Sequence, residues 1–97
     1  MNDLEKVREE IDDIDRQLVA IFERRMDKVL QVAAYKKRCN MPVQDISREN
    51  EVLAKNRRLL KNRLYQESLD SFFLSIMAIS RNLQDNLLSK SADREQD

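Results

Sequence analysis

Residues 4–25 read LEKVREEIDDIDRQLVAIFERR, which is the pattern of one long amphipathic helix. Apolar side chains recur on one face at alternating steps of three and four residues: Leu4, Val7, Ile11, Ile14, Leu18 and Ile21. The next position on this apolar stripe is Arg25, and Lys36 falls on the same face further along. A cation on the burial face of a helix is costly unless an anion meets it there. The two cations therefore suggest an anionic ligand.

The composition narrows the class of protein. The 97 residues suffice for one domain, and a content of 41% apolar and 37% charged residues suits amphipathic helices. Eighteen basic and eighteen acidic side chains give no net charge, which argues against nucleic acid or a membrane surface as a partner. The chain has no His and no Gly, which excludes a His general base, a P-loop and a dinucleotide-binding turn. We expect a protein without cofactor or metal.

The N-terminus and the single cysteine bear on location. The first residues, MNDLE, are acidic and are not followed by the apolar segment of a secretory signal. Cys39 has no second cysteine with which to form an internal disulfide, and no His to activate it. We therefore expect a cytoplasmic protein in which Cys39 has no special role.

Three helices and no strands are predicted. The first runs from residue 2 or 3 to about residue 38, where Asn40 can adopt the left-handed cap and Pro42 prevents continuation. The second begins after Asp45, a good N-cap, and reaches about residue 63. The third spans about residues 68–88. The prediction is an all-α protein.

The domain is expected to comprise residues 1–88, followed by a polar tail, residues 89–97, that frays. A first helix of 36 residues would be about 54 Å long, whereas a compact chain of this size is about 30–35 Å across. The helix must therefore extend beyond its own domain. We expect a second copy of the chain to cover it, in an intertwined homodimer.

Five polar residues interrupt or border the apolar stripes of these helices: Arg25, Lys36, Glu49, Ser80 and Gln84. Each also has a purely structural interpretation. Arg25 could form an ion pair with a neighbouring helix, and Lys36 and Glu49 could interact with the dipole at a helix end. Ser80 could form a hydrogen bond with its own helical turn, and Gln84 could lie at the edge of the core with its amide in water. If the helices pack through their stripes, the five converge on one pocket. Two cations, a carboxylate, a hydroxyl and an amide suit a small anion with hydroxyl or ether oxygens.

Arg8 adds a constraint on that pocket. It precedes Arg25 by 17 residues, which is about 25 Å along the helix and about 100° around it. It cannot share a small ligand with Arg25 of the same chain. In an antiparallel pairing of two long helices, the partner's Arg8 could reach that ligand.

Several blocks of the sequence resemble the all-helical, AroQ-class chorismate mutases. They are VREEIDDID at 7–15, RRM at 24–26, VAAYK at 32–36, PVQDISRE at 42–49 and ISRNLQ at 79–84. The resemblance covers about residues 4–85, and the blocks occur in the family's order and at similar spacing. It implies the family fold, an intertwined dimer of three-helix protomers, and conversion of chorismate to prephenate in phenylalanine and tyrosine biosynthesis.

The resemblance also implies residue roles. Arg25, with Arg8 of the partner subunit, would bind the two carboxylates of chorismate. Lys36 and Gln84 would donate to the ether oxygen whose bond breaks, and Glu49 would hold the ring hydroxyl. The further substrate contacts that the resemblance implies come from Ser80, Asp45 and Arg48.

Two alternatives remain open. The related isochorismate-pyruvate lyase shares this fold, although the Asp45-x-x-Arg48-Glu49 pattern favours the mutase. A helical dimerisation module without enzymatic activity would instead use Arg25 and Lys36 in structural ion pairs.

Overall fold

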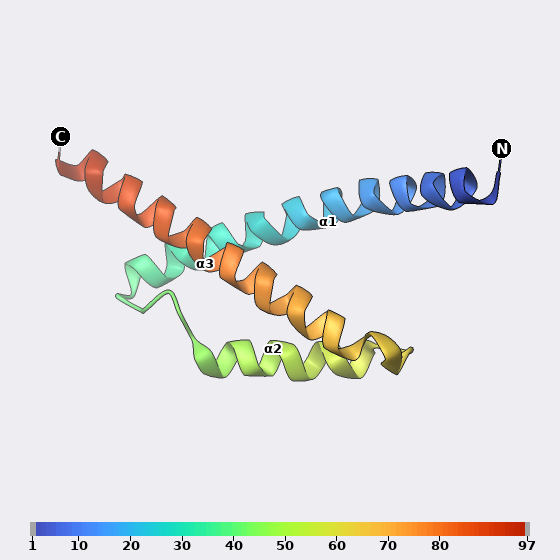
Figure 1. Cartoon of the computed structure of the whole chain (residues 1–97). Coiled ribbons are helices and arrows are strands. Elements are labelled where there is room, and N and C mark those ends of the chain that lie inside the picture. Colours follow the sequence, from blue (N-terminus) through green and yellow to red (C-terminus); the bar gives the residue numbers. More distant parts are fainter. Residues whose placement is uncertain (1, 97) are drawn as a thin grey trace.

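The structure, a computed structural model, describes residues 2–96, with side chains for residues 2–88. Its elements are α1 (Asp3–Arg38), α2 (Ile46–Leu59), a single 3-10 turn η1 (Arg63–Tyr65) and α3 (Gln66–Gln96), as Figure 1 shows. No strand occurs in this part of the chain, so the predicted all-α class is confirmed. None of the described helices is both long and apolar enough to cross a membrane.

Both ends of α1 are defined by local hydrogen bonds. At the start, the side chain of Asn2 accepts a hydrogen bond of 2.8 Å from the backbone N–H of Glu5. At the end, Asn40 takes a left-handed conformation with φ 55°. The backbone N–H groups of Asn40 and Met41 donate to the carbonyls of Lys37 and Lys36, which is the Schellman pattern. The predicted Asn40 cap is confirmed.

The boundary between α2 and α3 differs from the prediction. α2 ends at Leu59 instead of about residue 63, because Leu60 is extended and the side chain of Asn62 caps a new turn by accepting from the N–H of Leu64. That turn is η1, and it leads directly into α3, which therefore begins at Gln66 instead of Ser68. At its far end, α3 continues past Leu88 to Gln96.

The continuation of α3 has a simple cause, since residues 89–96 contain neither Gly nor Pro and nothing there stops a helix. The fraying expected of this tail stays a prediction. The division into a domain at 1–88 and a tail at 89–97 stays a prediction.

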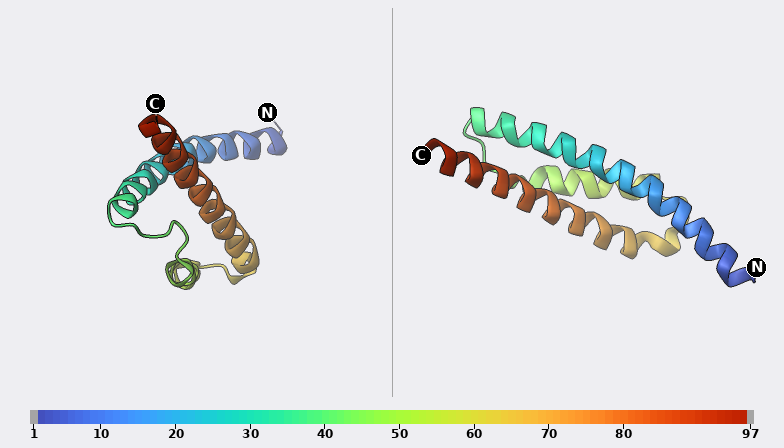
Figure 2. Two further views of the ribbon diagram at one scale, coloured as in Figure 1. Left: turned by 90° about the vertical axis from the view of Figure 1, so that its left-hand side faces the viewer. Right: turned by 90° about the horizontal axis from the view of Figure 1, so that it is seen from above.

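The three helices enclose a space between them. α3 packs against both α1 and α2, whereas the backbones of α1 and α2 do not approach each other closely in the described part of the chain. In the left panel of Figure 2, α2 lies opposite the C-terminal half of α1, and α3 extends from one to the other. The small core at this junction comprises Met26 of α1 with Ile76 and Met77 of α3, next to half-buried residues that include Val52 and Leu53 of α2.

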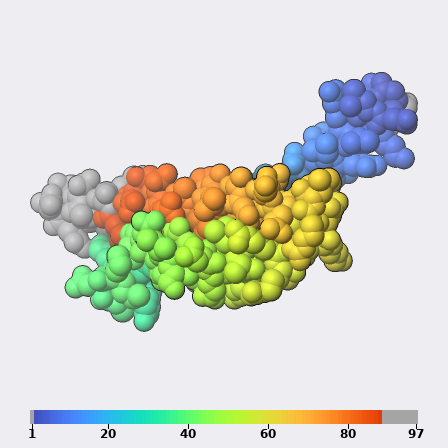
Figure 3. All heavy atoms as spheres, turned by 60° about the horizontal axis from the view of Figure 1, so that its bottom comes forward, coloured from blue at the N-terminus to red at the C-terminus, as the bar shows by residue number. Residues whose placement is uncertain are grey.

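The N-terminal half of α1 extends away from the other helices. Figure 3 shows it projecting from the body formed by the rest of the chain. The molecule measures 59 × 30 × 15 Å, with a radius of gyration of 17.5 Å against about 12–13 Å for a compact chain of this length. The apolar stripe is uncovered here, and Leu4, Ile14 and Leu18 are 57%, 59% and 47% exposed.

Candidate active site

Arg25 lies on the inner face of α1, where it meets α3. Its Nη1 donates a hydrogen bond of 2.7 Å to the hydroxyl of Ser80, which in turn donates to the carbonyl of Ile76 at 2.7 Å. Ser80 is buried and Arg25 is half-buried. Burial lowers the pKa of Arg25, and the positive charge of Arg48 lowers it further. Both effects destabilise the charged guanidinium of Arg25. An anion bound between Arg25 and Arg48 would therefore stabilise it.

Lys36 is held at the end of α1 by the turn that follows it. The Schellman bonds fix its backbone, and its Nζ donates a hydrogen bond of 2.7 Å to the carbonyl of Val43 in the loop before α2. The side chain is half-buried. The ammonium group is therefore positioned before any ligand arrives.

The first turn of α2 supplies three polar residues. Asp45 caps the helix by accepting a hydrogen bond of 3.0 Å from the N–H of Arg48. The guanidinium of Arg48 is exposed and pairs with Glu51 at 3.0 Å. Glu49 is half-buried, and its Oε2 accepts a hydrogen bond of 2.5 Å from Nη1 of Arg81 on α3.

Gln84 lies one turn beyond Ser80 on α3 and is only 6% exposed. Its Oε1 is enclosed but accepts no hydrogen bond from any described residue. Buried polar atoms in proteins nearly always have a partner, so an orphaned amide beside a cavity is a feature of a ligand site. Turning the amide over would exchange Oε1 and Nε2, so the same group can also present a donor.

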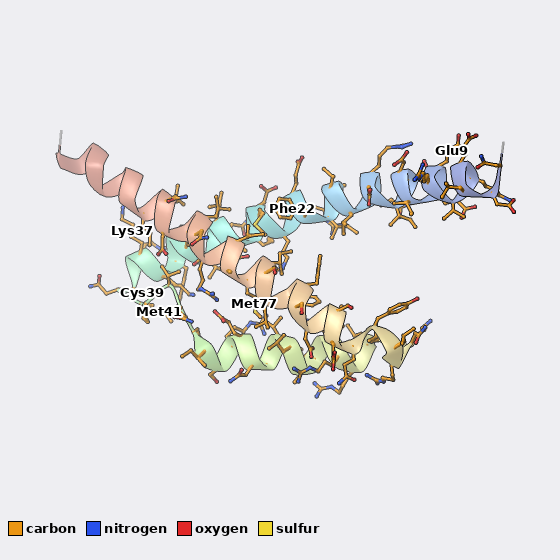
Figure 4. The ribbon with its side chains drawn as sticks, in the orientation of Figure 1. Glu9, Phe22, Lys37, Cys39, Met41 and Met77 are labelled. Carbon is orange, nitrogen blue, oxygen red and sulfur yellow. The ribbon has the colours of Figure 1, made fainter. Side chains whose placement is uncertain are left out.

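These groups line one cavity of about 280 Å3 between the three helices. Seven of the eight predicted site residues contribute to it: Arg25, Lys36, Asp45, Arg48, Glu49, Ser80 and Gln84. The lining contains five basic side chains and two carboxylates, a formal excess of three positive charges. Apolar walls come from residues such as Met77, which lies between α3 and α2 in Figure 4. The cavity suits a small anion.

Comparison with known proteins identifies the family of the chain. The family model described as chorismate mutase type II matches residues 7–85. The chain belongs to the chorismate mutase type II family. Residues 7–85 include Arg8 and every residue that lines the cavity.

One curated relative is the bifunctional chorismate mutase/prephenate dehydratase of Buchnera aphidicola subsp. Schizaphis graminum, which is 37% identical over 90 residues. The match covers 92% of this chain but only 23% of that relative, so the chain spans about a quarter of its length. No solved structure was found to match the chain.

The eighth predicted residue, Arg8, is exposed on the projecting half of α1 and does not line the cavity. Figure 4 shows its neighbour Glu9 far from the other helices. This placement agrees with the expectation that Arg8 cannot serve the site of its own chain. Among the described residues, no group of three or more His, Cys, Asp or Glu is arranged to hold a metal ion.

Two charged residues of the cavity lining were not predicted from the sequence, Lys28 and Arg81. Lys28 follows Arg25 by three residues, so helical spacing alone could have placed it beside that cation. Arg81 directly follows Ser80, and no interruption of an apolar stripe marks it. Its partner, Glu49, belongs to another helix, so only the packing of α2 on α3 identifies it.

Proposed function

We propose that this chain converts chorismate to prephenate in the cavity between its helices. The observation that carries the proposal is the convergence of Arg25, Lys36, Glu49, Ser80 and Gln84 on one cationic cavity. The rearrangement is intramolecular and needs no covalent intermediate, proton transfer, metal or cofactor. The protein has to fold the enolpyruvyl side chain over the ring and stabilise the charge that develops on the ether oxygen.

Each group has a role in that chemistry. Arg25, oriented by Ser80, binds a substrate carboxylate, and Arg48 can leave the exposed Glu51 to assist it. Lys36 and the amide of Gln84 donate to the ether oxygen as its bond to the ring lengthens. Glu49 accepts a hydrogen bond from the ring hydroxyl, and Asp45 contributes from the helix start.

We further propose that the active form is a homodimer in which Arg8 of the partner subunit completes each site. The support is the uncovered stripe on the N-terminal half of α1, which a second α1 would cover. An antiparallel pairing would bring the N-terminal half of one α1 alongside Arg25 of the other. A location in the cytoplasm stays a prediction.

The test has two stages. The purified chain is first mixed with chorismate, and the loss of its ultraviolet absorbance is followed. Conversion above the uncatalysed rate supports the proposal, and its absence refutes it. Pyruvate released from isochorismate at a higher kcat/KM than prephenate from chorismate would instead identify a lyase.

The second stage tests the shared site. Arg8→Ala and Lys36→Ala chains, each nearly inactive alone, are unfolded together and refolded. A mixed dimer then holds one site with both native residues, so about a quarter of all sites should regain activity. No recovery from dimers shown to be mixed would refute the sharing of residues between subunits.

A further inference from the structure

An ion pair between Arg81 and Glu49 joins α3 to α2 at the wall of the cavity. The two side chains are 29% and 21% exposed, and both line the cavity. The pair between Arg16 and Asp13 on the outer surface is by contrast 68% exposed on each side. Water screens an exposed pair strongly and a half-buried pair much less, so the Arg81 pair constrains its carboxylate more firmly.

The contact with Arg81 occupies only one of the two carboxylate oxygens of Glu49. Arg81 binds Oε2, which leaves Oε1 to accept a hydrogen bond from a ligand hydroxyl. Without Arg81, rotation about the side-chain bonds would move Oε1 over a range larger than a productive hydrogen bond allows.

We propose that Arg81 is a positioning residue, which holds Glu49 so that Oε1 aligns the substrate's hydroxyl-bearing ring for reaction. The inference rests on the proposed function, because it assigns Glu49 to that hydroxyl. Arg81 acts through Glu49 and not through a substrate carboxylate. Its contribution therefore depends on Glu49 being present and charged.

A double-mutant cycle tests this dependence. Steady-state kinetics with chorismate are measured for the native chain, Arg81→Met, Glu49→Gln and the double variant. We expect Arg81→Met to lower kcat about tenfold or more while KM changes less than about threefold, because a bound but misaligned ring reacts slowly. In a chain that already carries Glu49→Gln, Arg81→Met should lower kcat less than about twofold. Arg81→Lys, which retains the charge, should recover part of the loss.

The pair between Arg57 and Asp70 provides a matched control. It also joins α2 to α3, at 2.7 Å, but it lies outside the cavity. Arg57→Met should leave kcat nearly unchanged. An equal loss in Arg57→Met would show that the ion pairs serve only to dock the helices, and would overturn the assignment.

Other outcomes are equally decisive. An Arg81→Met chain with native kinetics would overturn the assignment. A loss of kcat of the same size with Glu49 and with Gln at position 49 would also overturn it. A substitution that mainly raises KM would show that Arg81 binds the substrate directly, which likewise contradicts a positioning role. If the native chain does not convert chorismate at all, the proposed function fails together with this inference. Failure with an active native chain concerns Arg81 alone.

Discussion

Replacing Lys36 with Ala should reduce kcat/KM by about 10²–10³-fold, which corresponds to about 2.7–4 kcal/mol of transition-state stabilisation. The magnitude follows from how the ammonium group is held. Its Nζ is 2.7 Å from the carbonyl of Val43, and the capping turn fixes the backbone of Lys36 itself. A donor fixed before the reaction needs no reorganisation as charge develops, and such donors contribute most to catalysis.

The same substitution also removes a structural bond, so stability has to be measured separately. A half-buried hydrogen bond from a charged donor contributes about 1.5–3 kcal/mol to the free energy of unfolding. Thermal and urea unfolding of the variant would give this cost. Activity is then expressed per folded chain, at a temperature where both proteins are native.

Lys37→Ala is the matched control, because it removes the same charge from the next residue, which does not line the cavity. The assay follows chorismate absorbance over a range of substrate concentrations, so that kcat and KM are obtained separately. Loss mainly in kcat is expected for a donor that acts in the transition state. A folded Lys36→Ala chain with kcat/KM within about threefold of the native value would refute the role of Lys36.

Three further predictions concern the ligand and the dimer. Ser80→Ala removes the acceptor of Arg25, and should raise KM several-fold and lower the free energy of unfolding by about 1–2 kcal/mol in urea titrations; an unchanged KM would contradict it. Leu18→Asp should abolish a dimer detectable by analytical ultracentrifugation, whereas the neighbouring Gln17→Asp should not, and a dimeric Leu18→Asp chain would refute the packing. A dianionic transition-state analogue at 100 times its Kd should stabilise the native state by about 2.7 kcal/mol, measured as a higher Tm, whereas a dimerisation module without a site would show no shift.

Much of the fold follows from signals that lie close together in the sequence. The bounds of α1 were predictable because Asn2 and Asn40 cap it through neighbouring residues. The end of α2 was not, because Leu60 continues the apolar pattern and no Gly or Pro interrupts it. The break depends on Asn62, whose side chain competes with the helix for backbone groups, and sequence periodicity does not report that competition.

The candidate site also contains some residues that could be predicted from the sequence and others that could not. Arg25 and Lys36 were predicted because a charge on an apolar stripe requires an explanation, and both line the cavity. Arg81 could not be predicted in this way, since its proposed role depends on Glu49, 32 residues away. A residue that interrupts an apolar stripe can be recognised from the sequence of one helix. A residue that acts through a partner on another helix can be recognised only once the packing of the helices is known.

The position of Arg25 on α1 connects folding with activity. Beyond Arg25, the helix buries Met26 and Ala33 within its own chain, whereas before Arg25 the stripe is uncovered as far as Leu4. Arg25 therefore stands where contacts within the chain give way to contacts with the proposed partner. Because the same association would cover the stripe and bring the partner's Arg8 to the cavity, stability and substrate binding should depend on chain concentration together. The apolar stripe of α1, which Arg25 and Lys36 interrupt, therefore connects the extended shape of the chain with the proposed location of its site.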